Sequence, residues 1–152
     1  MSSLNVGAGC NPQPGMVNLD RVALPGVDVV HDLDVFPWPF PDENFDQVVA
    51  VQVFEHVEHP VGFMREAWRV LKPGGTLLII VPHYLSENSH TDPTHRRHCT
   101  VHTWDYWIAG TPLNGSLGAQ YADGCEFDRV SIVATRDHER CPLDIVCELT
   151  RR

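Results

Sequence analysis

Short apolar runs, each closed by a turn residue or an acidic residue, make up much of the first half of the chain. These runs predict five strands, at residues 4–6, 16–19, 27–30, 46–53 and 76–81. The fourth run is almost wholly apolar, and continuous apolar strands are typical of a sheet that is covered on both faces. Between the fourth and fifth runs the apolar residues take helical spacing, at Val61, Met64, Ala67, Trp68 and Leu71. A strand, a helix and a strand in this order predict a parallel crossover unit.

The pattern changes after residue 84. Residues 85–124 are rich in His, Thr, Pro and Trp, and we expect one short helix near residues 103–109. Two longer apolar runs follow, at residues 126–135 and 143–150, on either side of a charged turn at residues 136–140. These two runs are expected to pair as an antiparallel hairpin.

Together the runs indicate an α/β fold, a Rossmann-like, mostly parallel sheet with a C-terminal antiparallel hairpin. The links between the first strands are unusually short, since only six residues separate Gly9 from Met16. Parallel neighbours normally need a crossover of about a dozen residues. Either the helices between the first strands are reduced to loops, which is the interpretation adopted, or the second strand lies elsewhere.

Composition narrows the class of protein. A chain of 152 residues fits a single domain, residues 1–152. Its longest apolar run is too short to cross a bilayer and no signal peptide is apparent, so a cytoplasmic protein without membrane attachment is expected. Five cysteines without a CxxC pair argue against a disulfide framework. A net charge of −9 argues against a nucleic-acid partner, because an acidic surface repels phosphate backbones and the one dense basic cluster, residues 95–98, is small.

Three of the predicted strands end in residues that suit a nucleoside. The turn Gly7-Ala8-Gly9 lets the backbone approach a ligand closely. Asp20, at the end of the second strand, can accept hydrogen bonds from a ribose diol, and Asp32, after the third, can accept from an exocyclic amine such as that of adenine. Each residue alone is more often a turn former or helix cap. Their serial order along one sheet edge predicts a nucleoside site.

A dinucleotide would use a similar edge, but its fingerprint needs a third glycine and a helix N-terminus for the pyrophosphate. Pro12 stands at the glycine position and Pro14 follows, so residues 10–15 cannot form much of a helix. A sulfonium cofactor has no phosphate and needs no such anchor. A dinucleotide oxidoreductase is therefore the least favoured interpretation.

Four segments carry a family resemblance: LNVGAG at residues 4–9, WPFPDENFD at 38–46, VFEHV at 53–57 and REAWRVLKPGG at 65–75. In this order they resemble the class I S-adenosylmethionine-dependent methyltransferases, in particular the group called type 11. The resemblance implies S-adenosyl-L-methionine as cofactor and methyl transfer to an acceptor, expected to be a small molecule. It also divides the domain into a cofactor-binding half at residues 4–84, an acceptor-side insert at 85–124 and the hairpin at 125–152.

The resemblance implies a set of cofactor-binding residues, namely Gly7, Ala8, Gly9, Asp20, Arg21, Asp32, Leu33, Gln52, Val53 and Glu55. Asp34 competes with Asp32 for the adenine. Most family members also carry an N-terminal helical extension over the cofactor, whereas this chain starts at the first strand. We therefore expect an open site, or one closed by a partner subunit in a homodimer.

The histidine-rich segment after the fifth strand would face the acceptor. His56, His90 and His95 are the candidate general bases, and Arg96 and Arg97 would suit an anionic acceptor group. A weaker alternative is a metal site, although the spacing matches no closed zinc pattern; its ligands would be His90, His95, His98 and His102. Ordinary loop structure also explains the segment.

Three functions thus remain open: a methyltransferase, a non-catalytic module that binds the cofactor or its demethylated product, and a metal-dependent enzyme.

Overall fold

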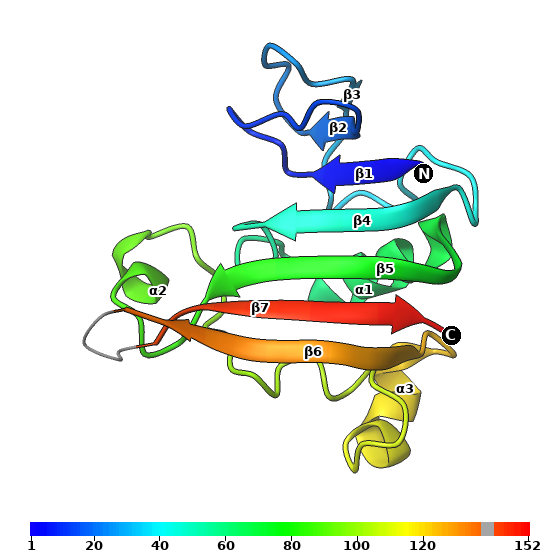
Figure 1. Ribbon diagram of the computed structural model, residues 1–152, viewed down its shortest axis with the longest axis vertical. Helices are drawn as coiled ribbons and strands as arrows, with labels where there is room; N and C mark the ends of the chain where they lie inside the picture. Colours follow the sequence, from blue (N-terminus) through cyan, green and yellow to red (C-terminus); the bar gives the residue numbers. More distant parts are fainter. Residues whose placement is uncertain (138–141) are drawn as a thin grey trace.

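The computed structural model describes residues 1–137 and 142–152. Its seven strands form one sheet in the order β3-β2-β1-β4-β5-β7-β6 (Figure 1). Five of them run parallel to one another, namely β1 (Ser3–Val6), β2 (Val17–Asp20), β3 (Val29–Val30), β4 (Phe45–Val51) and β5 (Leu71–Pro82). The antiparallel pair β6 (Phe127–Arg136) and β7 (Pro142–Arg151) joins the sheet at β5. The predicted α/β class and C-terminal hairpin are confirmed; most of the predicted charged turn lies outside the described residues.

The connection between β1 and β2 is a loop. Residues 8–16, all of them described, contain no helix. Asn18 on β2 holds this loop: its Oδ1 accepts from the Gln13 N–H at 2.7 Å and its Nδ2 donates to the Gln13 carbonyl at 3.1 Å. Asn5 on β1 donates to the same Oδ1 at 2.9 Å. The second strand is therefore where the sequence placed it, and the crossover helix is reduced to a loop.

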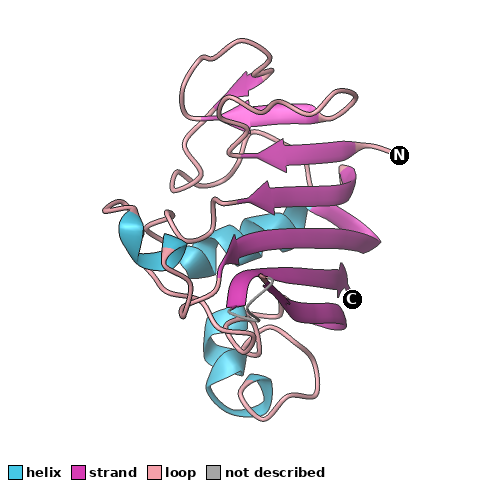
Figure 2. Cartoon of the chain, turned by 60° about the vertical axis from the view of Figure 1, so that its left-hand side comes forward, coloured by secondary structure: helices cyan, strands magenta, loops and turns pink. Residues whose placement is uncertain are grey.

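Helix α1 (Pro60–Val70) packs its apolar side against the sheet (Figure 2). Phe63, Met64, Ala67 and Val70 are buried there. The helix ends at Val70, and the chain enters β5 at Leu71 without an intervening turn. Leu71 pairs with Phe45 on β4, so the fifth strand begins five residues before the predicted Thr76.

The apolar strands are covered on one face only within the described residues. In Figure 1, α1 lies behind the sheet and no described helix lies in front of it. On the open face Val49, Leu78 and Ile80 are half-buried and Val51 is 42% exposed. The expectation of cover on both faces is wrong for this part of the chain, because a loop replaces the helix that would follow β1.

The remaining helices are short: α2 (Asn88–Thr91), the π-helix η1 (Asn114–Gly118) and α3 (Ala119–Ala122). The predicted helix at residues 103–109 is wrong, since this segment is a series of turns. Its end pairs with β6 instead, where the Ala109 N–H donates to the Phe127 carbonyl and the Phe127 N–H to the Trp107 carbonyl, each at 2.9 Å. The aromatic spacing reflects burial, because Trp104 and Trp107 both lie in the core.

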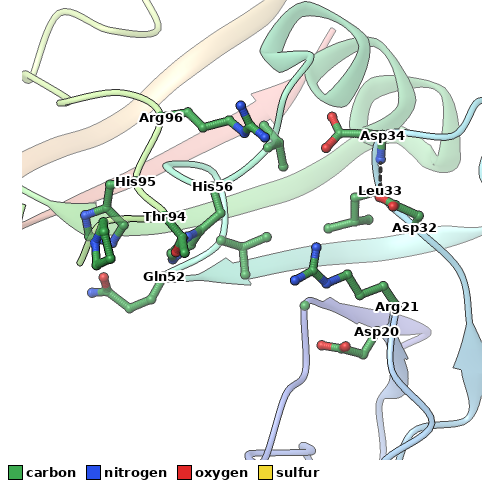
Figure 3. Close-up of a pocket in the computed structure, with 14 residues that line it drawn as sticks. Asp20, Arg21, Asp32, Leu33, Asp34, Gln52, His56, Thr94, His95 and Arg96 are labelled. Carbon is green, nitrogen blue, oxygen red and sulfur yellow. Dashed lines mark hydrogen bonds between the residues drawn. The ribbon is translucent and has the colours of Figure 1, made fainter.

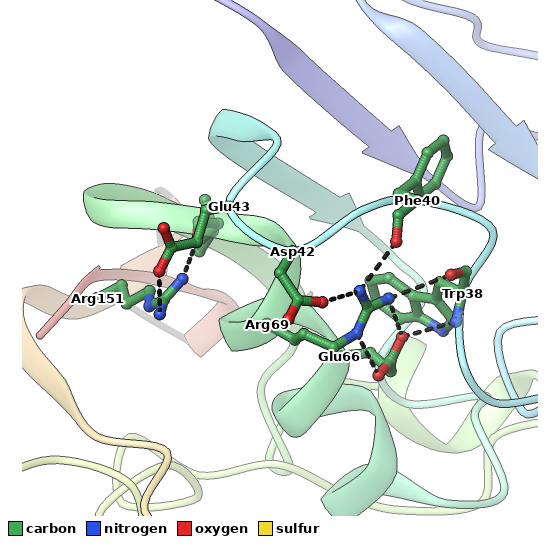
Figure 4. A network of polar contacts seen from close by, with 8 residues as sticks. Trp38, Phe40, Asp42, Glu43, Glu66, Arg69 and Arg151 are labelled. Carbon is green, nitrogen blue, oxygen red and sulfur yellow. Dashed lines mark hydrogen bonds and ion pairs between the residues drawn. The ribbon is translucent and has the colours of Figure 1, made fainter.

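An ion-pair network centred on the buried Glu66 fastens the segment before β4 to α1 (Figure 4). Glu66 on α1 accepts from the Trp38 N–H at 2.6 Å and from the Arg69 guanidinium at 2.7 and 2.9 Å. Arg69 also donates to the carbonyls of Trp38 and Phe40 and to the Asp42 carboxylate. The network fixes the direction in which the chain enters β4.

Three of the cysteines, Cys99, Cys125 and Cys147, are buried free thiols, and Cys10 is a free thiol at the surface. Cys141 lies outside the described residues. None of the described helices has the length and apolar character needed to span a membrane.

Candidate functional site

A cavity of about 840 Å³ opens at the carboxyl ends of the parallel strands (Figure 3). The strand order reverses between β1 and β4, and open α/β sheets bind ligands in the crevice at such a point. Its wall is formed by Gly7, Asp20, Arg21, Asp32, Leu33, Asp34, Gln52, Val53, His56, Val57, Pro93, Thr94, His95 and Arg96. Most of the predicted cofactor residues are in this wall; Ala8, Gly9 and Glu55 are not.

The glycine turn after β1 brings the backbone to the edge of the cavity. Gly7 has a positive φ of 66°, and a Cβ at this position would overlap the Val53 side chain. Only glycine therefore fits between β1 and the end of β4. Gly9 contributes differently, because its N–H donates to Asp20 Oδ2 at 2.8 Å and so ties the turn to β2.

Asp20 places its carboxylate in the wall at the end of β2. Besides the bond from Gly9, its Oδ1 accepts from the Val22 N–H at 2.9 Å. Each carboxylate oxygen can accept more than one hydrogen bond. The group is thus held by two backbone donors and retains acceptor capacity toward the cavity, as a ribose diol would require.

Asp32 and Asp34 differ in the backbone donors that their carboxylates accept from. The two oxygens of Asp34 accept from the N–H groups of Glu58 and His59, at 2.9 and 2.8 Å, which fastens this loop to the residues before α1. Asp32 Oδ1 accepts from the Asp34 N–H at 3.0 Å, a local turn. Asp32 is therefore the better placed of the two to accept from a ligand amine.

The end of β4 contributes the floor of the cavity. Gln52 has a positive φ of 55°, and its Nε2 donates to the Asp144 carboxylate on β7 at 3.2 Å. Val53 lies beneath Gly7. This sharp change of direction after β4 turns residues 55 and 56 back toward the segment that follows β5.

Glu55 lies beside His56 and His95, the two histidines that line the end of the cavity far from Asp20 (Figure 3). Glu55 is 1% exposed, and neither carboxylate oxygen has a hydrogen-bond partner among the described residues. Its burial raises the pKa of this carboxyl to about 7. His95 Nε2 lies 4.0 Å from Glu55 Oε1, and the rings of His56 and His95 are 4.6 Å apart. Burial lowers the pKa of His56.

The segment that carries His95 is docked onto the loop after β4. The Arg96 N–H donates to the Glu55 carbonyl at 2.8 Å, and the Arg97 guanidinium donates to the carbonyls of Phe54 and Val57. Arg97 thus holds its own segment against the loop after β4. Arg96 pairs with Glu58 at 2.7 Å and, unlike Arg97, lines the cavity.

The other predicted histidines lie elsewhere. His90 bonds to the Tyr84 carbonyl at 2.8 Å and stacks on His98 at 4.2 Å, whereas His102 bonds to Asp105 at 2.9 Å. The four histidines of the predicted metal site therefore do not converge. In the described part of the chain, the side chains close enough to share a metal ion are Glu55, His56 and His95.

Sequence reasoning did not group Glu55 with the two histidines, and it did not single out Thr94, which bonds to His56 Nδ1 at 3.0 Å. A signal was available in the strand order. Residues 55 and 56 follow β4, residues 92–96 follow β5, and these two strands are parallel neighbours whose carboxyl ends lie side by side.

The shape of the site fits a nucleoside that lacks phosphates. The loop at residues 8–16 offers no helix N-terminus to a pyrophosphate. The wall near it carries the carboxylates of Asp20, Asp32 and Asp34, which favour hydroxyl and amine donors or a positive charge and repel a phosphate.

Comparisons with known proteins point the same way. The profile of the family described as methyltransferase domain matches residues 5–79. A probable S-adenosylmethionine-dependent methyltransferase of Mycolicibacterium smegmatis is 36% identical over 110 residues, which are 68% of this chain and 42% of that protein. A ubiquinone/menaquinone biosynthesis C-methyltransferase of Pseudomonas putida is 31% identical over 121 residues, 80% of this chain and 43% of that protein. The chain spans less than half the length of these relatives.

The fold also matches a solved structure. The Burkholderia thailandensis 1,6-didemethyltoxoflavin-N1-methyltransferase, with 1,6-didemethyltoxoflavin and S-adenosylhomocysteine bound, superposes with a TM-score of 0.62. The match covers 99% of this chain and 70% of that one at 13% sequence identity. At this level of identity the likeness concerns the fold.

Proposed function

Because the chain belongs to the class I S-adenosylmethionine-dependent methyltransferases, we propose that it transfers the methyl group of S-adenosylmethionine to a small-molecule acceptor. The observation that carries the proposal is the cavity at the switch point of the sheet, with Gly7, Asp20 and Asp32 in its wall. These residues lie at or just after the ends of β1, β2 and β3, which are parallel neighbours in the sheet.

Each end of the cavity has its own task in this proposal. Asp20 accepts from the ribose hydroxyls, Asp32 accepts from the adenine amine, and Gly7 allows the methionine part to approach the backbone. Leu33 and Val53, both largely buried, supply apolar surface for the base and the sugar. The opposite end, with Gln52, Thr94 and the two histidines, receives the acceptor.

When bound, S-adenosylmethionine supplies an electrophilic methyl group on a sulfonium. The protein's contribution is to hold the acceptor nucleophile in line with that methyl group and to help remove its proton. His56 and His95 are the proposed groups for proton removal, because both line the cavity. His90 does not line it and is left out of the proposal.

The test is a methyl-transfer assay with S-adenosylmethionine labelled in its methyl group. Small acceptors of different classes, such as phenols and hydroquinones, amines and carboxylates, are offered singly, and transferred label and S-adenosylhomocysteine are both measured. We expect acceptor-dependent formation of S-adenosylhomocysteine with at least one class. Cofactor binding without turnover on the whole panel would instead favour a non-catalytic module, and the absence of binding would reject the cofactor site itself.

A further inference from the structure

We propose that Glu55, His56 and His95 bind a divalent transition-metal ion such as Zn²⁺ at the acceptor end of the cavity. One ligand atom from each side chain lies within 4.8 Å of the other two. Bonds from zinc to nitrogen and oxygen of about 2.0–2.2 Å place neighbouring ligand atoms about 3–3.5 Å apart. The observed separations therefore need only a small inward adjustment of the side chains.

In both His56 and His95 the Nδ1 atom makes a hydrogen bond to the protein, which leaves Nε2 available to a metal ion. His95 Nδ1 is 3.0 Å from the Ser89 carbonyl, which can only accept, so this nitrogen carries the proton and Nε2 the lone pair. The Thr94 hydroxyl donates to Asp92 Oδ1 at 2.7 Å, so at 3.0 Å it accepts from His56 Nδ1. Outer partners of this kind orient the histidine ligands of metal sites.

Glu55 supplies the independent observation. Its side chain is buried and lies 4.0 Å from His95 Nε2, beyond hydrogen-bond distance. Neither oxygen has a partner in the described part of the chain. A buried carboxylate without a partner is costly unless it takes up a proton, is paired or coordinates a metal. A cation between Glu55 and the two Nε2 atoms supplies the missing partner.

The site is of the open kind. His56 and His95 also line a second cavity of about 590 Å³, on the side of Gln52 and Asp144. Two histidines and one glutamate leave a coordination position that faces solvent or ligand, as in catalytic zinc sites. If the proposed methyl transfer is correct, that position receives the oxygen or nitrogen of the acceptor. The cation, in place of a free imidazole, then lowers the pKa of the bound acceptor group, whose proton passes to solvent water before the methyl group is transferred. Metal binding itself does not rest on the methyl transfer.

The experiment measures metal binding by the metal-free protein. Chelator-treated protein is titrated with Zn²⁺ in a calorimeter, and the Co²⁺-substituted protein is recorded by absorption spectroscopy, whose d–d bands report nitrogen and oxygen ligands. We expect one ion per chain. The substitutions Glu55→Gln and His95→Gln should each weaken Zn²⁺ binding by at least about tenfold and alter the Co²⁺ spectrum.

His102→Gln is the matched control, since this exposed histidine belongs to the same segment but not to the cluster. Its affinity for Zn²⁺ should equal that of the wild type. Should Glu55→Gln fail to fold, Thr94→Val tests the outer partner of His56 and should also weaken binding. Circular dichroism checks the fold of each variant. Titration of the same protein with S-adenosylhomocysteine shows whether the cofactor site is intact when metal binding is lost. Absence of bound metal in the wild type, or equal losses in His102→Gln, would overturn the proposal.

Discussion

At the scale of single residues, Asp20 has two roles that its position in the sequence shows only in part. The pattern predicted a carboxylate at the end of a strand, and the structure adds that it fixes the glycine turn through Gly9. Asp20 is thereby linked to the backbone that would contact the methionine part of the cofactor. Loss of its side chain should affect both contacts at once.

We therefore predict that Asp20→Ala weakens S-adenosylhomocysteine binding by at least about tenfold, or about 1.4 kcal/mol. Asp20→Asn should be milder, because an amide oxygen can still accept from the Gly9 N–H. Isothermal titration calorimetry measures the affinities, with Asp123→Ala as control, since that exposed aspartate pairs with Arg65 away from the cavity. An unchanged affinity in Asp20→Ala would mean that the ribose lies elsewhere.

Single residues also show which parts of the site the sequence could predict and which it could not. Gly7, Asp20 and Asp32 could be placed at one sheet edge because each follows a recognisable strand. Glu55 was expected to contact the cofactor, but the positive φ at Gln52 turns the chain, and Glu55 is buried beside His95. Nothing in the local sequence specifies that turn or the distant residue it meets.

At the scale of elements, the network around Glu66 holds the segment before β4 on α1. We predict that Glu66→Ala lowers the free energy of unfolding by about 2–4 kcal/mol, because it leaves the Trp38 N–H and the Arg69 guanidinium without their shared acceptor. Urea unfolding followed by tryptophan fluorescence is the measurement. Asp42→Ala removes the exposed partner of the same arginine and should cost less than about 1 kcal/mol. Equal effects of the two substitutions would contradict a central role for Glu66.

The elements that the sequence predicted well are those with a strong local signal. The parallel strands are short apolar runs with clear ends, and α1 has a proline start and a regular apolar face. The helix expected at residues 103–109 failed because aromatic spacing alone did not reveal that this segment pairs with β6, a partner about twenty residues later. The helices α2, η1 and α3 span only four or five residues each, too short for a periodic pattern.

At the scale of the whole molecule, the sheet order explains why the site has two unlike ends. The reversal between β1 and β4 opens the nucleoside end, where acidic side chains follow the short strands. The neighbouring ends of β4 and β5 form the other end, with its histidines and buried glutamate. Motifs in the sequence marked the first end, whereas the second is assembled from segments about forty residues apart. A homodimer that closes the cavity stays a prediction.

The central claim is that this cavity binds S-adenosylmethionine, and calorimetric titration of the wild-type protein with S-adenosylhomocysteine tests it most directly. We predict saturable binding of one ligand per chain with a Kd in the micromolar range, which corresponds to a binding free energy of about −8 kcal/mol. NAD should show no comparable binding. At about 1 mM ligand even a Kd near 1 mM, a binding free energy of about −4 kcal/mol, would be detected. Failure to bind S-adenosylhomocysteine at that concentration would contradict the account.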